Sequence, residues 1–179
     1  MFQKILVAMD CSEMNKSVFD KALSLAETTG ASCKLLHVLF VEEDAYPESL
    51  TSSLWSYGSS LKDLAFDSHN KRLKILEMKG LKLLRSHSLA AKAVGVQVES
   101  TQILGSPGRT ICNAARSWDA DLIIIGSRGL FGPSELRLGN VSNYVNRHAP
   151  CSVLVVHSQA KDEVKLSESS KVTAAEQVI

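Results

Sequence analysis

The sequence has little of what several classes of protein require. Its 20 lysines and arginines balance 19 aspartates and glutamates, so a net charge of +1 gives no basic excess for binding nucleic acid. No apolar run reaches the roughly 18 residues that a transmembrane helix needs, so we expect no membrane partner. The N-terminal residues form a strand-like run without the features of a signal peptide. We therefore expect a cytoplasmic protein.

Cysteine and histidine are too dispersed to predict a disulfide framework or a metal site. Cys11, Cys33, Cys112 and Cys151 form neither a Cys-x-x-Cys pair nor a Cys/His cluster, and we interpret them as small core residues. The five histidines lack metal-ligand spacing, and we interpret His37 as a histidine packed in a strand or at its edge. No metal ligand is therefore assigned.

Several well-known catalytic and nucleotide motifs are missing. No Gly-x-Gly-x-x-Gly follows the first strand-like run, and no Gly-x-x-x-x-Gly-Lys-[Ser/Thr] occurs in the chain. There is also no Gly-x-Ser-x-Gly. These absences argue against a dinucleotide-dependent dehydrogenase, a P-loop NTPase and the simplest type of serine hydrolase.

Short apolar runs alternate with longer segments of helical period, which predicts an α/β fold. The predicted strands are Ile5 to Ala8, Cys33 to Phe40, Val96 to Leu104, Leu122 to Ile125 and Val153 to Val156. The predicted helices run from Ser12, as the cap, to Gly30, from Leu61 to Val94, from Pro107 to Trp118, and from Asn140 to His148. This order predicts a doubly wound, five-stranded parallel sheet with strand order 3-2-1-4-5, in a single domain.

Two segments depart from that minimal plan. The helix from Leu61 to Val94 carries Gly80 midway, where we expect a kink or a break, because glycine weakens a helix interior. The polar stretch 42–60 lengthens the preceding connection. Residues 1–157 form the predicted domain, and 158–179 are expected to be a flexible C-terminal tail.

Ligands of such sheets bind outside the carboxyl ends of the strands, where the strand order reverses. The first strand is followed there by Asp10, and the fourth by Gly126, Arg128 and Gly129. The chain then reaches a helix start that contains Ser142. Glycine backbone, a cation and a helix N-terminus together predict a phosphate-binding cradle. The alternative is that the glycines only permit turns.

The sequence leaves two interpretations of Asp10 open. It can cap the helix that follows the first strand, as aspartate often does. It can instead contact a ribose or a base, or hold a metal through water.

The spacing Gly126-x2-Gly129-x9-Gly139 resembles the nucleotide motif of the universal stress protein family, of the ATP-binding type. The flanking blocks match as well: Lys4 to Glu13, Leu35 to Val38, Gly105 to Pro107, Ala120 to Gly129, and Ala149 to Val156. The resemblance covers residues 1–157.

The resemblance implies a stress-response sensor or regulator that binds ATP with Mg²⁺ and changes its interactions with an unidentified regulatory protein. It implies no enzyme, or at most slow ATP hydrolysis. Carried over by position, the adenosine side would be lined by Ala8, Met9, Asp10 and Val38, and the ribose and phosphates by Gly126, Arg128, Gly129, Gly139, Asn140, Val141 and Ser142.

Asn140 departs from the family pattern, in which Ser or Thr usually follows the third glycine. Asparagine is bulkier and has no hydroxyl for a phosphate, so ADP, AMP or cyclic AMP are alternatives to ATP. A nucleotide-independent dimeric scaffold is a further alternative. In the family, edge strands pair across a two-fold axis, so we expect a homodimer through Cys151 to His157.

Overall fold

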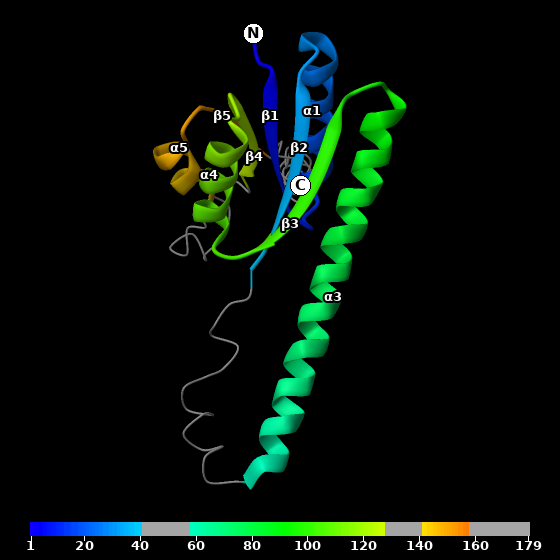
Figure 1. Cartoon of the computed structure of the whole chain (residues 1–179), viewed down its shortest axis with the longest axis vertical. Coiled ribbons are helices and arrows are strands. Elements are labelled where there is room, and N and C mark those ends of the chain that lie inside the picture. The colour runs from blue at the N-terminus through cyan, green and yellow to red at the C-terminus, as the bar shows by residue number, and fades with distance from the viewer. Residues whose placement is uncertain (41–57, 128–140, 158–179) are drawn as a thin grey trace, which may run out of the picture.

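The computed structural model describes residues 1–40, 58–127 and 141–157, and within the second range it describes side chains from residue 70 onward (Figure 1). Strands and helices alternate along these residues. They are β1 (Lys4–Met9), α1 (Met14–Thr29), β2 (Ser32–Leu39), α3 (Gly58–Ala93), β3 (Val98–Leu104), α4 (Pro107–Trp118), β4 (Leu122–Ser127), α5 (Val141–His148) and β5 (Ser152–His157). The expected polar connection from 42 and the expected tail from 158 lie outside the described residues, apart from the first helical turn at 58–60.

All five strands are parallel, and their order is β3-β2-β1-β4-β5, which confirms the predicted topology. β1 lies in the centre, where Ile5 is opposite Cys33 of β2 on one side and Leu122 of β4 on the other. The chain leaves β1 toward β2 and later returns to β4 on the opposite side. The strand order therefore reverses between β1 and β4.

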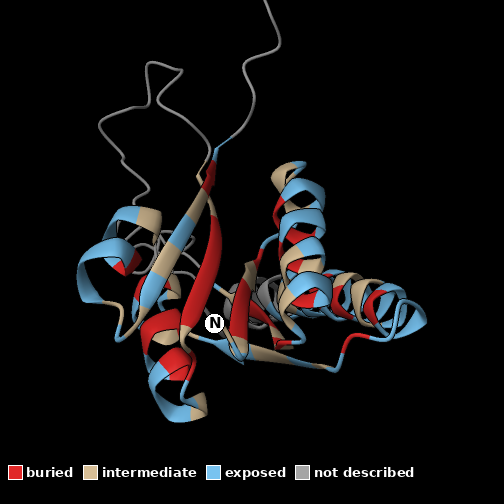
Figure 2. Cartoon of the chain, turned by 90° about the horizontal axis from the view of Figure 1, so that it is seen from above, coloured by how far each residue is buried: buried red, intermediate tan, exposed pale blue. Residues whose placement is uncertain are grey.

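The sheet is covered on both faces, and alternate residues of each strand serve the two cores. Ile5, Val7 and Met9 of β1 pack beneath α1 and α3, whereas Leu6 packs beneath α4 and α5. Buried residues follow the strands through the middle of the molecule (Figure 2). Burial on both faces explains why β1 and β4 read as continuous apolar runs rather than as alternating ones.

The Asp121 carboxylate fixes the start of β1 beside β4. Its Oδ2 accepts hydrogen bonds from the backbone N–H of Gln3 at 2.6 Å and of Lys4 at 3.2 Å. The two strands on either side of the reversal point are therefore joined by a side chain as well as by their ladder.

The predicted kink or break at Gly80 is wrong, because α3 is one continuous helix of 36 residues. The space that a side chain would take at Gly80 is filled by the neighbouring sheet. A Cβ atom there would lie 2.5 Å from Nδ1 of His37 in β2 and 2.5 Å from Oε1 of Gln102 in β3. The glycine permits a close helix–sheet approach and does not interrupt the helix.

Element bounds differ from expectation by a few residues, as in the third strand. It begins at Val98, and Val96 is buried just before it. Ile103 near its end is 37% exposed, because this strand lies at the edge of the sheet. The last helix is described from Val141.

Candidate functional site

The carboxyl ends of β1 and β4 meet at one edge of the sheet, at the point where the strand order reverses. In open α/β sheets this is the place where a crevice for a ligand forms. Helix α5 runs back toward the opposite edge before β5, so its N-terminus also lies at this edge. We call this edge the switch-point site.

The end of β1 presents one polar group at this site. Met9 is buried, Ala8 is half-buried and Asp10 is exposed. Oδ1 of Asp10 accepts hydrogen bonds from the backbone N–H of Ser12 at 3.0 Å and from its hydroxyl. The aspartate therefore orders the turn that leads into α1, and its carboxylate stays at the surface.

The expected capping of α1 by Ser12 is wrong. The residue before the helix is Glu13, and no side chain caps the first turn. The hydroxyl of Ser12 instead donates a hydrogen bond to the Asp10 carboxylate, which also accepts the backbone N–H of Ser12. Asp10 acts on the turn rather than as the helix cap, and whether it contacts a ligand stays a prediction.

A cysteine–histidine pair lies beside this turn. Sγ of Cys11 lies 3.7 Å from Nε2 of His37, which is only 7% exposed. Burial, together with the negative charge of Asp10, raises the pKa of the Cys11 thiol, against a smaller opposite effect of Lys79. Burial lowers the pKa of His37, and Asp10 and Gln102 offset this only in part. The pair is therefore a neutral thiol beside a neutral imidazole at pH 7.

This pair was not identified from the sequence. The prediction that His37 is packed in a strand is confirmed, but the prediction that all cysteines are core residues is wrong for Cys11, which is exposed. Cys33 and Cys112 are buried, as expected, and Cys151 is half-buried. The position of Cys11 just beyond the end of a strand could have indicated that it is not a core residue.

At β2, Val38 is half-buried and follows His37 directly. Met9 of β1 lies opposite His37 of β2, so Val38 is one residue further toward the carboxyl ends of the strands. Its backbone lies near the carboxyl edge of the sheet, and its contact with adenine stays a prediction.

At β4, Gly126 and Ser127 end the strand and are half-buried. A Cβ atom on Gly126 would lie 3.1 Å from Cγ2 of Val18 in α1. The glycine thus has a packing role, since it lets α1 approach the end of β4. The next predicted residues, Arg128, Gly129, Gly139 and Asn140, lie outside the described residues.

Helix α5 supplies backbone donors. Val141 and Ser142 form its first turn and are half-buried. The N–H groups of a first helical turn have no partner within the helix, and they carry the positive end of its dipole. The helix is anchored on α4, where the ring of Tyr144 fills the space beside Gly108.

Within the described ranges, no three His, Cys, Asp or Glu side chains lie close enough to hold a metal ion. The donors at the switch-point site are one carboxylate, backbone amides and a hydroxyl. This set suits a ligand that has hydroxyls and an anionic group of its own. It does not form a complete metal cage.

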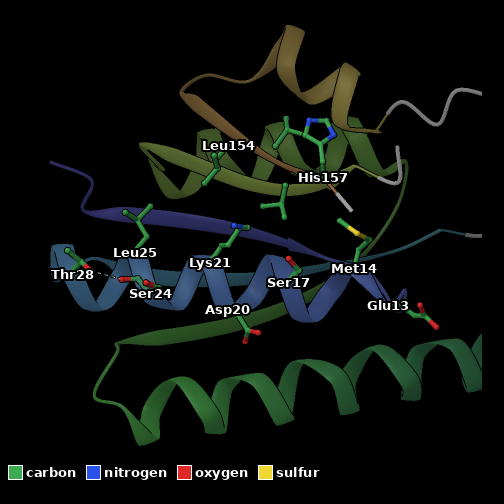
Figure 3. Close-up of a pocket in the computed structure, with 12 residues that line it drawn as sticks. Glu13, Met14, Ser17, Asp20, Lys21, Ser24, Leu25, Thr28, Leu154 and His157 are labelled. Atoms are coloured by element: carbon green, nitrogen blue, oxygen red, sulfur yellow. Dashed lines mark hydrogen bonds between the residues drawn. The ribbon is translucent and has the colours of Figure 1, made fainter. Parts of the chain in front are cut away.

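A groove lies between α1 and β5, and its end at Glu13, Met14 and His157 borders the switch-point edge (Figure 3). The volume of the groove is about 1080 Å³. Ser17, Lys21 and Leu25 line it from α1, and Leu154 and His157 from β5. Leu154 is 41% exposed, so this side of the edge strand is only partly covered.

Fold and site together define an open, doubly wound α/β domain whose candidate ligand site lies at the reversal of strand order. The model of the universal stress protein family matches residues 1–157, and the chain belongs to this family. The match ends where β5 ends. None of the described helices is both long and apolar enough to cross a bilayer.

Two universal stress proteins align with this chain over nearly their whole length. The universal stress protein Sll1388 of Synechocystis is 32% identical over 158 residues, which are 87% of this chain and 97% of the relative. The universal stress protein YxiE of Bacillus subtilis is 35% identical over 156 residues, which are 87% of this chain and 99% of the relative.

Solved structures share the fold. Universal stress protein UspA from Lactobacillus plantarum superimposes with a TM-score of 0.67 at 22% identity, over 87% of this chain and 97% of that one. A family member from Arabidopsis thaliana, solved with AMP bound, gives a TM-score of 0.60 at 25% identity, over 88% and 93%. A universal stress protein in complex with cAMP gives 0.58 at 21% identity, over 88% and 98%.

Proposed function

We propose that this protein binds an adenine nucleotide at the switch-point site and acts in a stress response as a sensor or regulator. The observation that supports this most directly is the topology, which brings Asp10, the carboxyl ends of β2 and β4 and the first turn of α5 to the same edge of the sheet. The AMP complex of the Arabidopsis relative adds support from within the same family.

The groups present fit the parts of such a nucleotide. The Asp10 carboxylate accepts hydrogen bonds from ribose hydroxyls, and the backbone at Val38 contacts the adenine edge. The N–H groups at Val141 and Ser142 face the phosphate, because helix N-termini favour anions. Arg128, Gly129, Gly139 and Asn140 complete the phosphate side in this proposal, and Ala8, Met9 and Gly126 form its floor.

The length of the phosphate chain decides whether Mg²⁺ takes part. Magnesium usually binds through one or two carboxylates together with substrate phosphates. At the described part of the site only Asp10 supplies a carboxylate, so Mg²⁺ would enter with ATP or ADP and not before them. Asn140 in place of a hydroxyl residue favours a shorter phosphate chain.

The proposed role is regulatory, with ATP hydrolysis slow or absent. His37, at the level of Met9 in β2, is buried, and its Nε2 lies beside Sγ of Cys11. Nucleotide occupancy would then change the surface offered to a regulatory partner protein, rather than drive turnover.

Calorimetric titration with AMP, ADP, ATP and cyclic AMP, each with and without Mg²⁺, tests this function. We expect micromolar binding of at least one nucleotide, and a Mg²⁺ effect only for ADP and ATP. Asp10→Ala should weaken binding, whereas Asp20→Ala, an exposed aspartate within α1, should not. Absence of binding by all four would contradict the proposal and favour a nucleotide-independent scaffold.

We also propose that two copies pair through β5, from Cys151 to His157. β5 is an edge strand with β4 as its neighbour in the described sheet, and an uncovered edge is a template for another strand. The partly exposed Leu154 and the groove beside α1 provide apolar surface for the same interface.

The opposite edge of the sheet supplies a matched control for this dimer. Leu104 in β3 is 66% exposed and lies on the other edge strand. Light scattering at micromolar concentration should report a dimer for the native chain and for Leu104→Lys, and a monomer for Leu154→Lys. A monomeric native chain would overturn this part of the proposal.

A further inference from the structure

Helix α3 has an outward face that the site and the proposed dimer do not use. The helix lies along one side of the sheet and extends well beyond its end (Figure 1). Its buried positions, Gly80, Leu84 and Ala91, recur at helical spacing and contact the sheet side. The residues half a turn away from them form a second stripe that points outward.

This outward stripe contains large apolar side chains. Ile75 is 54% exposed, Met78 is 62% exposed and Leu89 is 61% exposed. They are separated by three and then eleven residues, so all three lie along one line of the helix. Single exposed apolar residues are normal on a protein surface, but three on one helix face favour an interaction site.

The same stripe is strongly basic. Between residues 70 and 93 the chain has seven lysines and arginines and one acidic residue, Glu77, although the whole chain is nearly neutral. Lys82 and Arg85 lie between Met78 and Leu89 on the outward line, and neither has an ion-pair partner among the described residues. Lys82 and Arg85 are therefore available to an external anionic surface.

We propose that the outward face of α3, defined by Ile75, Met78, Lys82, Arg85 and Leu89, binds the surface of an anionic phospholipid bilayer. A helix that lies in the plane of an interface places apolar side chains between the headgroups and lysines and arginines beside the phosphates. Lysine and arginine side chains on the same helix face as the apolar residues can reach the phosphates, because their stems are apolar and their charged ends extend outward. The expectation of no membrane partner was based on spanning segments, which such binding does not need.

Other occupants fit this face less well. A second copy of α3 would bring Lys82 and Arg85 against like charges at the centre of the contact. Single-stranded nucleic acid is usually held by stacking on aromatic rings, and residues 70–93 contain no aromatic Phe, Tyr or Trp. An acidic protein would match the charge, but it would also need a groove that complements the helix. A bilayer surface needs no such groove and can contact a long, straight face that carries both apolar and basic side chains.

Co-sedimentation of the full chain with lipid vesicles tests the proposal. We expect binding to vesicles that contain phosphatidylglycerol, and little binding to pure phosphatidylcholine vesicles. Raising the salt from about 0.1 M to about 1 M shortens the Debye length from about 10 Å to about 3 Å and should weaken the binding. Failure to bind phosphatidylglycerol vesicles at low salt would overturn the proposal and leave an acidic protein as the candidate partner.

Charge-reversal variants locate the surface. Lys82→Glu with Arg85→Glu should weaken vesicle binding at least about 10-fold, since each basic residue near an anionic surface contributes appreciably. The matched control, Lys16→Glu with Arg116→Glu, makes the same change of charge on exposed positions of α1 and α4 and should bind more tightly than the α3 variant. Equal weakening by both pairs would show an effect of net charge alone and contradict the assignment to α3.

The apolar part of the face has its own variant. Met78→Ser keeps every charge and should reduce the binding that remains at high salt. Circular dichroism and nucleotide titration of each variant check that the domain stays folded. Nucleotide binding should be unchanged by these substitutions, so loss of membrane binding is distinguishable from loss of the proposed function.

Discussion

Replacement of Gly80 by alanine tests the packing of α3 against the sheet. In an ordinary helix interior this change is favourable by about 1 kcal/mol, because alanine loses less backbone entropy and is the best helix former. Here the added methyl group would lie 2.5 Å from Nδ1 and 2.6 Å from Cε1 of the His37 ring. The ring is 7% exposed, so it has little room to withdraw.

The size of the effect follows from these two opposing contributions. Adding a methylene-sized group to a well-packed interior costs about 1–3 kcal/mol. The helix-propensity gain of about 1 kcal/mol offsets part of it. We therefore expect Gly80→Ala to lower the free energy of unfolding by about 1 kcal/mol. The other close contact, Oε1 of Gln102, ends a flexible side chain and contributes less.

Urea unfolding followed by circular dichroism measures this quantity. Ser86→Ala, at an exposed position of the same helix, is the control for helix propensity and should stabilise slightly. In a His37→Ala background the obstacle is gone, so Gly80→Ala should become stabilising. An increase of the free energy of unfolding by about 1 kcal/mol in Gly80→Ala, the full gain in helix propensity, would show that the His37 ring does not obstruct the methyl group.

Three further predictions concern single side chains. Because the folded pKa of His37 is lowered, the unfolded chain binds a proton that the folded chain does not once the pH falls below about 6.5. As the pH decreases below that value, the free energy of unfolding should therefore decrease, by at most about 1.4 kcal/mol per pH unit. The decrease should be smaller in His37→Gln. An equal pH dependence of the two chains would contradict the lowered pKa of His37. The raised pKa of the Cys11 thiol should make its alkylation by iodoacetamide slower at pH 7 than that of a free thiol, as mass spectrometry can follow; a faster reaction would show an activated thiolate instead. Asp121→Ala should lower the free energy of unfolding by about 1–3 kcal/mol through loss of the two backbone hydrogen bonds at the start of β1, and a neutral result in urea unfolding would disprove that role.

The fold could be predicted from the sequence because each local signal agrees with it. Leu122 to Ile125 reads as a buried central strand, and both faces of β4 are covered in the structure. Pro107 marks the first turn of α4 and Gly30 the end of α1, where a left-handed φ of 71° is needed. The alternation of such elements restricts the connections to right-handed parallel crossovers.

The parts that could not be predicted depend on contacts between residues far apart in the chain. Gly80 looks like a helix breaker by local rules, and its purpose is visible only beside His37, 43 positions earlier. Cys11 meets the same histidine across 26 positions. The role of Ser12 was missed for a local reason, because competition between its hydroxyl bond to Asp10 and a helix cap is decided by turn geometry.

Amide chemical shifts on addition of AMP, ADP, ATP and cyclic AMP in turn show whether an adenine nucleotide binds at the carboxyl ends of β1 and β4. We expect the largest changes to cluster at Met9, Val38, Gly126 and Ser142, with small ones along the groove between α1 and β5. Changes centred on that groove, or no changes with any of the four at saturation, would contradict binding at this site.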